Sequence, residues 1–223
     1  MILIGFVSFF LTSSFNSSLH AQAFQKGSLL LSVSEGGTSA DYSTSDISNS
    51  KPVQVHKSQI EGERDPLIIE YGISKKWGLG LTSGADIFEV DPSKFYGFKR
   101  YDNKPVEVTT SELTFDGNYH FLVNKRLDLA AFVSLGFFSV SFEGNGVGDD
   151  ETSYTYSANG NIIRTGVRVR YYFFKRFGAF GMLSSYSGNC SPKDFKENTV
   201  ANNYSTKISG NAVEIGLCYR FLK

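Results

Sequence analysis

Residues 67–81 of the chain read LIIEYGISKKWGLGL, two alternating segments on either side of a short basic turn. Before the turn, Leu67, Ile69 and Tyr71 alternate with positions such as Glu70, and after the turn leucine alternates with glycine. Because successive side chains of a β-strand point to opposite faces, this alternation gives each strand one apolar face. The stretch therefore predicts a β-hairpin.

The hairpin pattern recurs at intervals of 50 residues. Basic turns stand at 74–77 (SKKW), 124–127 (NKRL) and 174–177 (FKRF), and the same phase reaches residues 25–27 and Phe221 near the two ends of the chain. Each turn is flanked by segments with one apolar face and one face of small, polar or charged residues. Four such units predict eight antiparallel strands.

At their other ends, the strands are predicted to be joined by longer polar connections, at residues 35–65, 91–111, 143–156 and 188–209. Short turns at one end and long loops at the other are typical of an outer-membrane barrel, with its turns in the periplasm and its loops outside the cell. Eight strands enclose an interior just wide enough for side chains. We therefore predict an all-β fold, an eight-stranded antiparallel transmembrane up-and-down β-barrel.

The apolar face is predicted to contact lipid, since its aromatic residues are too bulky for one level of so narrow an interior. They suit a girdle at the membrane interface, formed by Tyr71, Trp77, Phe121, Tyr171, Phe177 and Phe221. The opposite face carries glycine and charged residues of both signs. These charged groups are predicted to pair inside the barrel and plug it, and they are Glu70, Asp86, Asp116, His120, Asp128, Arg164, Arg168, Arg170, Glu214 and Arg220.

The first 23 residues predict a signal peptide. An apolar run over 2–11 is followed by a polar segment and then by Ala21-Gln22-Ala23, a small-residue cleavage site. The run is too short to cross a bilayer. We therefore expect export, with residues 1–23 as the signal peptide and residues 24–223 as the barrel domain.

The composition excludes several classes of protein. The chain has 22 Lys and Arg against 22 Asp and Glu, so nothing favours a nucleic-acid partner. Two cysteines are too few for a disulfide framework, and no apolar run is long enough for a helical membrane bundle. We place Cys190 in an outer loop and Cys218 inside the barrel near the periplasmic rim, so no disulfide is expected.

Two segments resemble those of a known family. Residues 214–221 (EIGLCYRF) follow a C-terminal pattern that resembles the recognition signal of bacterial outer-membrane proteins. Together with residues 71–80 (YGISKKWGLG), they make the chain similar to the small outer-membrane β-barrel superfamily that includes OmpX-like and OmpA-like barrels. The resemblance implies insertion by the barrel-assembly machinery, and contact with outer-membrane lipid and lipopolysaccharide. It implies no single activity.

Candidate catalytic and metal-binding residues are few. His56 and Ser58, with Glu61 and Glu63 nearby, are similar to the His-x-Ser plus Glu set of the barrel enzyme that deacylates lipid A. That enzyme carries the set on a strand, whereas here it falls in the longest predicted loop. His120 has no second His or Cys ligand in the strand register. We therefore predict no catalytic residue, metal or cofactor.

The function favoured by these observations is that of a non-enzymatic outer-membrane barrel with a plugged lumen and long loops for surface binding or envelope stabilisation. Aromatic residues interleaved with cations in the second loop suit contact with an extracellular protein or glycan, or rest on the lipopolysaccharide surface; they are Phe95, Tyr96, Phe98, Lys99, Arg100 and Tyr101. The alternatives are a narrow small-solute channel, an outer-leaflet lipid A hydrolase and a soluble periplasmic barrel.

Overall fold

The structure is a computed structural model that describes residues 24–46, 53–90, 106–145, 153–192 and 204–221. No helix suited by length and hydropathy to crossing a bilayer occurs in these ranges. The strands are β1 (Leu29–Asp46), β2 (Val53–Arg64), β3 (Leu67–Gly72), β4 (Trp77–Val90), β5 (Val106–Val123), β6 (Leu127–Asn145), β7 (Ser153–Tyr172), β8 (Phe177–Pro192) and β9 (Tyr204–Phe221).

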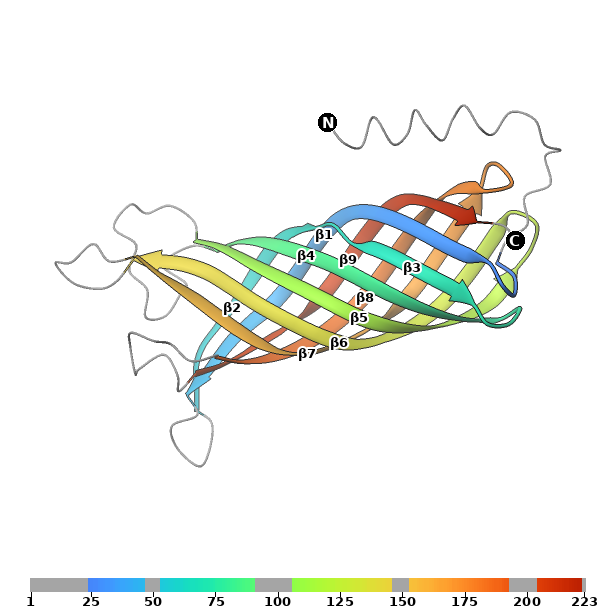
Figure 1. The fold of residues 1–223 in the computed structure, drawn as a ribbon. Helices are drawn as coiled ribbons and strands as arrows, with labels where there is room; N and C mark the ends of the chain where they lie inside the picture. The colour runs from blue at the N-terminus through green and yellow to red at the C-terminus, as the bar shows by residue number, and fades with distance from the viewer. Residues whose placement is uncertain (1–23, 47–52, 91–105, 146–152, 193–203, 222–223) are drawn as a thin grey trace.

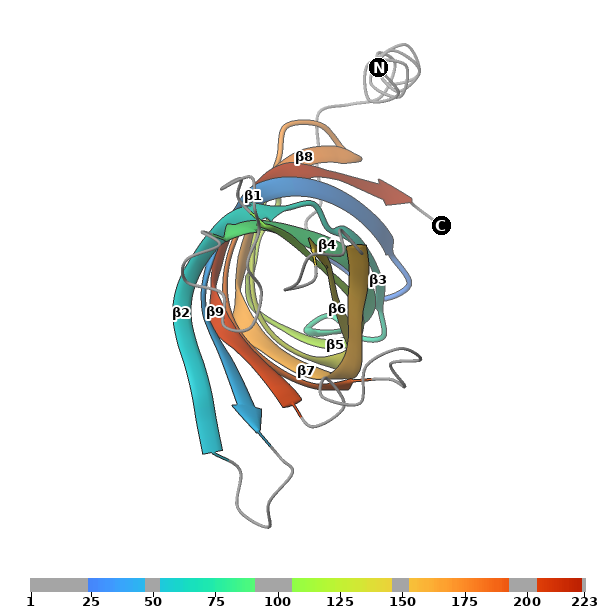
Figure 2. The ribbon, with the colours of Figure 1, turned by 90° about the vertical axis from the view of Figure 1, so that its left-hand side faces the viewer.

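The strands form one antiparallel sheet that closes on itself through β1 and β9 (Figures 1 and 2). β2 and β3 are two parts of one barrel strand, because the register of their pairing with β1 and with β4 is the same on both sides of the gap between them. They are separated at Asp65 and Pro66, where proline has no backbone N–H to donate. The barrel therefore has eight strands, which confirms the predicted fold class.

The strand register also sets the tilt of the barrel. Cross-strand partners followed around the sheet from Ser32 return to β1 at Tyr42, ten positions further along. With the usual spacings along and between strands, this stagger corresponds to a tilt of about 40°. A tilt of this size lies in the normal range for closed barrels.

The short basic turns lie together at one end of the barrel, which we name the turn end; the opposite end is the loop end (Figure 1). In the first turn, the Trp77 backbone N–H donates to Ser74 Oγ at 3.0 Å. In the second, the Leu127 N–H donates to Asn124 Oδ1 at 2.8 Å. The interval of 50 residues is thus one hairpin plus its outer connection.

The predicted first loop is wrong in extent. β1 continues to Asp46 and β2 begins at Val53, so much of 35–65 is strand. His56 and Ser58 accordingly lie on β2, and Cys190 lies on β8 instead of in a loop. The remaining connections, at 47–52, 91–105, 146–152 and 193–203, are outside the described residues.

Candidate functional site

A network of charged side chains fills the barrel interior near the turn end. His120 Nδ1 lies 2.7 Å from Asp128 Oδ1, and its Nε2 lies 2.8 Å from Glu70 Oε1. A neutral imidazole has only one N–H, so these two contacts together call for the doubly protonated ring. Arg170 Nη1 donates to Asp128 Oδ2 at 2.9 Å and Nη2 donates to Glu70, which also accepts from Arg168 at 3.4 Å.

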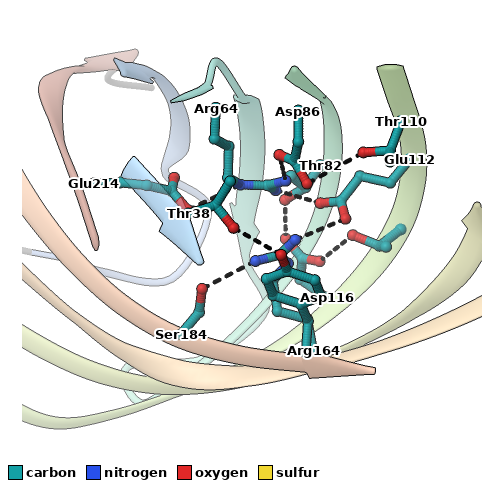
Figure 3. A network of polar contacts seen from close by, with 12 residues as sticks. Thr38, Arg64, Thr82, Asp86, Thr110, Glu112, Asp116, Arg164, Ser184 and Glu214 are labelled. Carbon is teal, nitrogen blue, oxygen red and sulfur yellow. Dashed lines mark hydrogen bonds and ion pairs between the residues drawn. The ribbon is translucent and has the colours of Figure 1, made fainter. Parts of the chain in front are cut away.

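A second network crosses the middle of the barrel (Figure 3). Arg64, at the end of β2, donates to three carboxylates on three other strands. The distances are 2.6 Å to Asp86 Oδ1 and 3.0 Å to Glu214 Oε1, and the third partner is Glu112. Arg164 donates to the other oxygen of Glu112 at 2.9 Å. Because all five side chains are buried, each charge depends on its protein partners for solvation.

The buried charges of the described interior balance in number. Six carboxylates face five arginines and His120, so the interior is neutral when His120 is protonated. The carboxylates are Glu70, Asp86, Glu112, Asp116, Asp128 and Glu214, and the arginines are Arg64, Arg164, Arg168, Arg170 and Arg220. Such balance is required, since an uncompensated buried charge is strongly destabilising.

The structure places all ten sequence-predicted lumen residues in the barrel interior, buried from solvent. Asp116 belongs to neither network directly and accepts hydrogen bonds from Thr82 at 2.5 Å and Thr114 at 3.1 Å. Arg220 lies at the turn end and donates to the Lys175 carbonyl at 2.6 Å.

Sequence reasoning missed Arg64 and Glu112, the two residues that hold the central network together. The expected first loop includes Arg64, and Glu112 falls at the start of an expected strand. The signal for Arg64 was available: the inward positions Glu70, Ile68 and Pro66 continue to it with the same period of two.

An inner apolar cluster lies among the charged groups at the turn end and contains Phe24, Leu30, Ile68, Phe132, Tyr172, Phe180, Met182 and Cys218. Several of these residues interrupt the polar pattern of the inward face in the sequence. Arg168 lies over the Phe132 ring at 5.1 Å, a cation–π contact. The apolar residues that interrupt the polar pattern of the inward face therefore pack together in one cluster.

The segment before β1 covers this end of the interior. Phe24 is 3% exposed, and its ring stacks on His120 with 3.5 Å between centroids and 9° between planes. Gly27, in the left-handed region with φ of 81°, donates its N–H to the Gly72 carbonyl at 2.7 Å. A side chain at Gly72 would meet the Gln25 carbonyl, so glycine there makes room for the segment.

Replacing Phe24 by alanine should make His120 accessible to water. The ring covers one face of an imidazole that is otherwise enclosed by the barrel, so its removal gives water a path from the turn end. Hydrogen–deuterium exchange at the His120 ring carbon between the two nitrogens, followed by mass spectrometry, should rise several-fold. Phe221→Ala, which removes an exposed aromatic from the outer face at the same end, should leave it unchanged. Equal exchange in the Phe24 variant and the parent would contradict this role.

Towards the loop end, the interior becomes apolar. An outer apolar cluster comprises Ala40, Tyr42, Ile60, Phe88, Val90, Val108, Phe138, Val140, Phe142, Ala158, Ile162, Tyr186, Cys190, Ile208 and Ala212. The boundary with the central network is marked by Tyr186, which exchanges a hydrogen bond of 2.7 Å with Thr38 and lies under the Arg164 guanidinium. The sequence reasoning did not anticipate this layer.

The outer face of the barrel changes from apolar to polar towards the loop end, which is the reverse of the change in the interior. On β9 the outward residues Ile215 and Val213 are exposed and apolar, whereas Asn211 and the outward residues beyond it are polar. The same change occurs on β6, where Leu135 and Phe137 are followed by serines. From Leu127 to Phe137 on β6, the apolar zone is about 25 Å tall along the barrel axis, the height of the lipid-facing band of membrane barrels.

The barrel therefore has two zones. The first zone, which we name the membrane band, has an apolar outer face around the part of the interior that holds the charged networks. The collar, at the loop end, has a polar outer face over the outer apolar cluster and extends about 20 Å further along the axis on β6. Its outward residues include Asp41, Glu61, Glu89, Glu107, Ser139, Asn161, Asn189 and Asn211.

The predicted aromatic girdle residues lie on the outer face next to the turns. Tyr71, Trp77, Phe121, Tyr171 and Phe221 are exposed, and Phe177 is half-buried. Two girdle residues contact further tyrosines there: Trp77 lies 4.9 Å from Tyr119, and Phe221 lies 4.9 Å from Tyr219, measured between ring centroids.

The remaining candidates do not form a site. Ser58 is buried on the inner face and donates to the Gln59 carbonyl at 3.3 Å, whereas Glu61 and Glu63 are exposed on the outer face. A serine and these glutamates on opposite faces cannot act on one substrate. Within the described ranges, no group of three His, Cys, Asp or Glu side chains is arranged to hold a metal ion. The predicted loop-contact residues, 95–101, lie outside those ranges.

Comparison with known proteins bears on the fold. No protein-family model matches the sequence. No curated protein matches it either. The solid-state NMR structure of the outer membrane protein AlkL in lipid bilayers matches with a TM-score of 0.51, over 94% of this chain and 97% of that chain, at 11% identity. The chain has the fold of a small outer-membrane β-barrel.

Two further outer-membrane barrels match at slightly lower scores. OprG from Pseudomonas aeruginosa has a TM-score of 0.49 at 12% identity, over 90% of this chain and 99% of that chain. A major outer membrane protein from Thermus thermophilus has a TM-score of 0.49 at 14% identity, over 84% of this chain and 99% of that chain. The outer-membrane barrel fold is the one that the resemblance to OmpX-like and OmpA-like proteins implied.

Proposed function

We propose that this chain is a non-enzymatic integral outer-membrane protein with a closed lumen, whose collar carries the outer connections for surface binding or envelope stabilisation. In this proposal, residues 1–23 are a signal peptide that directs export, and residues 24–223 form the barrel that the assembly machinery inserts. Outer-membrane lipid and lipopolysaccharide surround the membrane band. A narrow small-solute channel and an outer-leaflet lipid A hydrolase remain the alternatives.

The exchange of polarity between the membrane band and the collar is the observation that carries the proposal. A barrel wall in lipid needs an apolar outer face and satisfied polar groups within. A barrel wall in water needs the reverse, because apolar side chains are then driven inwards. The same eight strands meet both requirements in turn, so they suit a protein that crosses a membrane and projects from it.

A closed lumen is supported by the three interior layers. The central network ties strands on opposite sides of the barrel together through Arg64. Apolar clusters lie towards both ends, and Phe24 covers the turn end. We therefore expect no single-channel steps from the purified protein in planar bilayers. Clear steps would favour the channel.

The collar is expected to react from the outside of the cell. A cysteine placed at Ser139, outward on the β6 collar, should be labelled in intact cells by a membrane-impermeant maleimide. A cysteine placed at Leu135, 57% exposed and four residues away on the same face, should resist labelling because lipid covers it. The native Cys190 and Cys218 are buried and should contribute little background. Labelling of both variants would contradict the proposed position of the membrane.

The outer connections are proposed to contact an extracellular protein or glycan through Phe95, Tyr96, Phe98, Lys99, Arg100 and Tyr101. The test is to replace 93–103 by a short Gly-Ser linker and to compare binding of whole cells to host-protein and glycan arrays. The variant should keep the gel-mobility shift of a folded barrel on boiling. Loss of binding with the barrel intact supports a contact role for this connection, and unchanged binding opposes it.

A further inference from the structure

Two cysteines lie on neighbouring strands but at opposite ends of the barrel interior. Cys190, on β8, belongs to the outer apolar cluster, and Cys218, on β9, belongs to the inner apolar cluster. Both are free thiols and both are buried. The Cys190 thiol donates to the Phe138 carbonyl, with 4.0 Å between Sγ and the oxygen. Neither thiol has a role in the networks described above.

The strand register keeps the two thiols far apart. Cys218 pairs with Gly178 on β8, which is twelve residues from Cys190 on that strand. At about 3.3 Å per residue, the separation is about 40 Å. A disulfide requires Cα atoms within about 7 Å of each other. The folded barrel and a Cys190–Cys218 disulfide therefore exclude one another.

In the unfolded chain, the same two thiols meet readily. They are separated by 27 residues, and the entropy cost of closing a loop grows only slowly with its length. This step rests on the proposed function, because an exported chain passes unfolded through the periplasm, a compartment that oxidises thiols. The barrel buries both thiols once it has formed, so the exposed period is the transit before insertion.

We infer that Cys190 and Cys218 form a redox-sensitive block on barrel folding. The thiolate of one cysteine attacks the disulfide of an oxidised thiol–disulfide oxidoreductase or of oxidised glutathione, and releases one thiolate. The second cysteine then attacks the mixed disulfide and releases the other. The chain gives up two electrons and two protons, and the oxidant is reduced to two thiols. A dithiol reductant reverses both steps.

The disulfide acts on the strand that closes the barrel. β9 pairs with β8 on one side and with β1 on the other, along the whole of β1 (Figures 1 and 2). Joining Cys218 to Cys190 removes the β8–β9 register, so β9 cannot be placed beside both neighbours. The oxidised chain is thus left with unpaired strand edges, which are open to aggregation and proteolysis.

The test compares the full mature chain after oxidation and after reduction in urea. Each sample is diluted into detergent micelles, and folding is followed by the gel-mobility shift on boiling and by circular dichroism. We expect the reduced chain to fold, the chain oxidised with glutathione disulfide to show only background folding, and dithiothreitol to restore it. Oxidant added after folding should have no effect, because both thiols are then buried.

Three variants serve as controls. The double variant should fold equally well with and without the oxidant, since it can form neither the internal disulfide nor a mixed disulfide with glutathione. In the oxidised parent, a mass lower by two hydrogens identifies the internal disulfide, whereas Cys190→Ala and Cys218→Ala can only gain glutathione. Should a variant fold poorly even when reduced, the rescue of the oxidised parent by dithiothreitol still decides the question. Equal folding of the oxidised and reduced parent overturns the inference alone. Failure of the reduced parent to form a barrel in micelles counts against the proposed function instead.

Discussion

Replacing Arg64 by methionine is expected to destabilise the barrel by about 3 to 5 kcal/mol, the usual cost of removing one partner from a buried ion pair. Methionine keeps much of the side-chain volume but leaves Asp86, Glu112 and Glu214 with one fewer cation among them. Glu112 retains Arg164 at 2.9 Å. The measurement is the free energy of unfolding in urea from lipid vesicles.

Lys57 provides the matched control. It forms a single salt bridge of 3.4 Å with Asp41, and both side chains are more than half exposed on the collar. Pairs of this kind are worth about 1 kcal/mol or less. Lys57→Met should therefore change the free energy of unfolding far less than Arg64→Met does, although both variants remove one cation.

A rescue experiment separates the charge of Arg64 from its packing. Adding Glu214→Gln to Arg64→Met removes a carboxylate that has lost its only arginine and restores the balance of interior charges, while Glu112 keeps Arg164, so part of the lost stability should return. If the Glu214 substitution instead adds to the loss, then Arg64 acts mainly through its packing. A loss below about 1 kcal/mol for Arg64→Met alone would show that the central network contributes little to the stability of the barrel.

The barrel itself could be predicted from particular positions. The turns at Ser74 and Asn124 lie one repeat apart, and both have short polar side chains that accept the backbone N–H groups of the turn. Between the turns, the alternation of two classes of residue is a local property that each strand shows by itself. Eight strands, their direction and the inward face of Glu70 or Arg168 follow from local patterns alone.

The collar could not be predicted in the same way. On β1, the inward residues Thr38, Ala40 and Tyr42 still alternate with outward polar ones, but the inward face is now the apolar one. In the collar the apolar residues lie on the inner face and the polar residues on the outer face. A search for strands whose outer face is apolar therefore finds no strand there and assigns the segment to a loop. The period of two continues through the exchange, which is the feature that would have extended the strand.

The pairing of charged side chains within the interior also could not be predicted from local sequence patterns. Arg64 meets Glu214 across 150 positions of sequence because β1 lies between their strands in the closed sheet. Such a meeting depends on the stagger of ten positions around the barrel, and the stagger is a property of the whole ring. The composition of the interior was therefore predictable residue by residue, whereas its networks required the register.

The substitution Ile215→Arg should destabilise the barrel by about 2 to 4 kcal/mol, because Ile215 faces outward near the middle of the membrane band. Ile215 is 70% exposed, so the arginine would not be excluded by lack of space. Its cost would come from placing a charge in hydrocarbon. Arginine at Asn211, on the same face of β9 and four residues nearer the loop end, should cost little more than the exposed hydrogen bond from Ser185 that Asn211 accepts.

The comparison of these two variants depends on the surrounding medium as well as on the protein. In lipid vesicles, the difference in free energy of unfolding should be large, since only position 215 lies in hydrocarbon. Both positions are on the same face of β9, and each is paired with β1 and β8. A general free-energy cost of placing arginine on a strand would therefore be the same at both positions. Equal losses at the two positions would place the edge of the membrane elsewhere, and the exchange of polarity between band and collar would then need a different explanation.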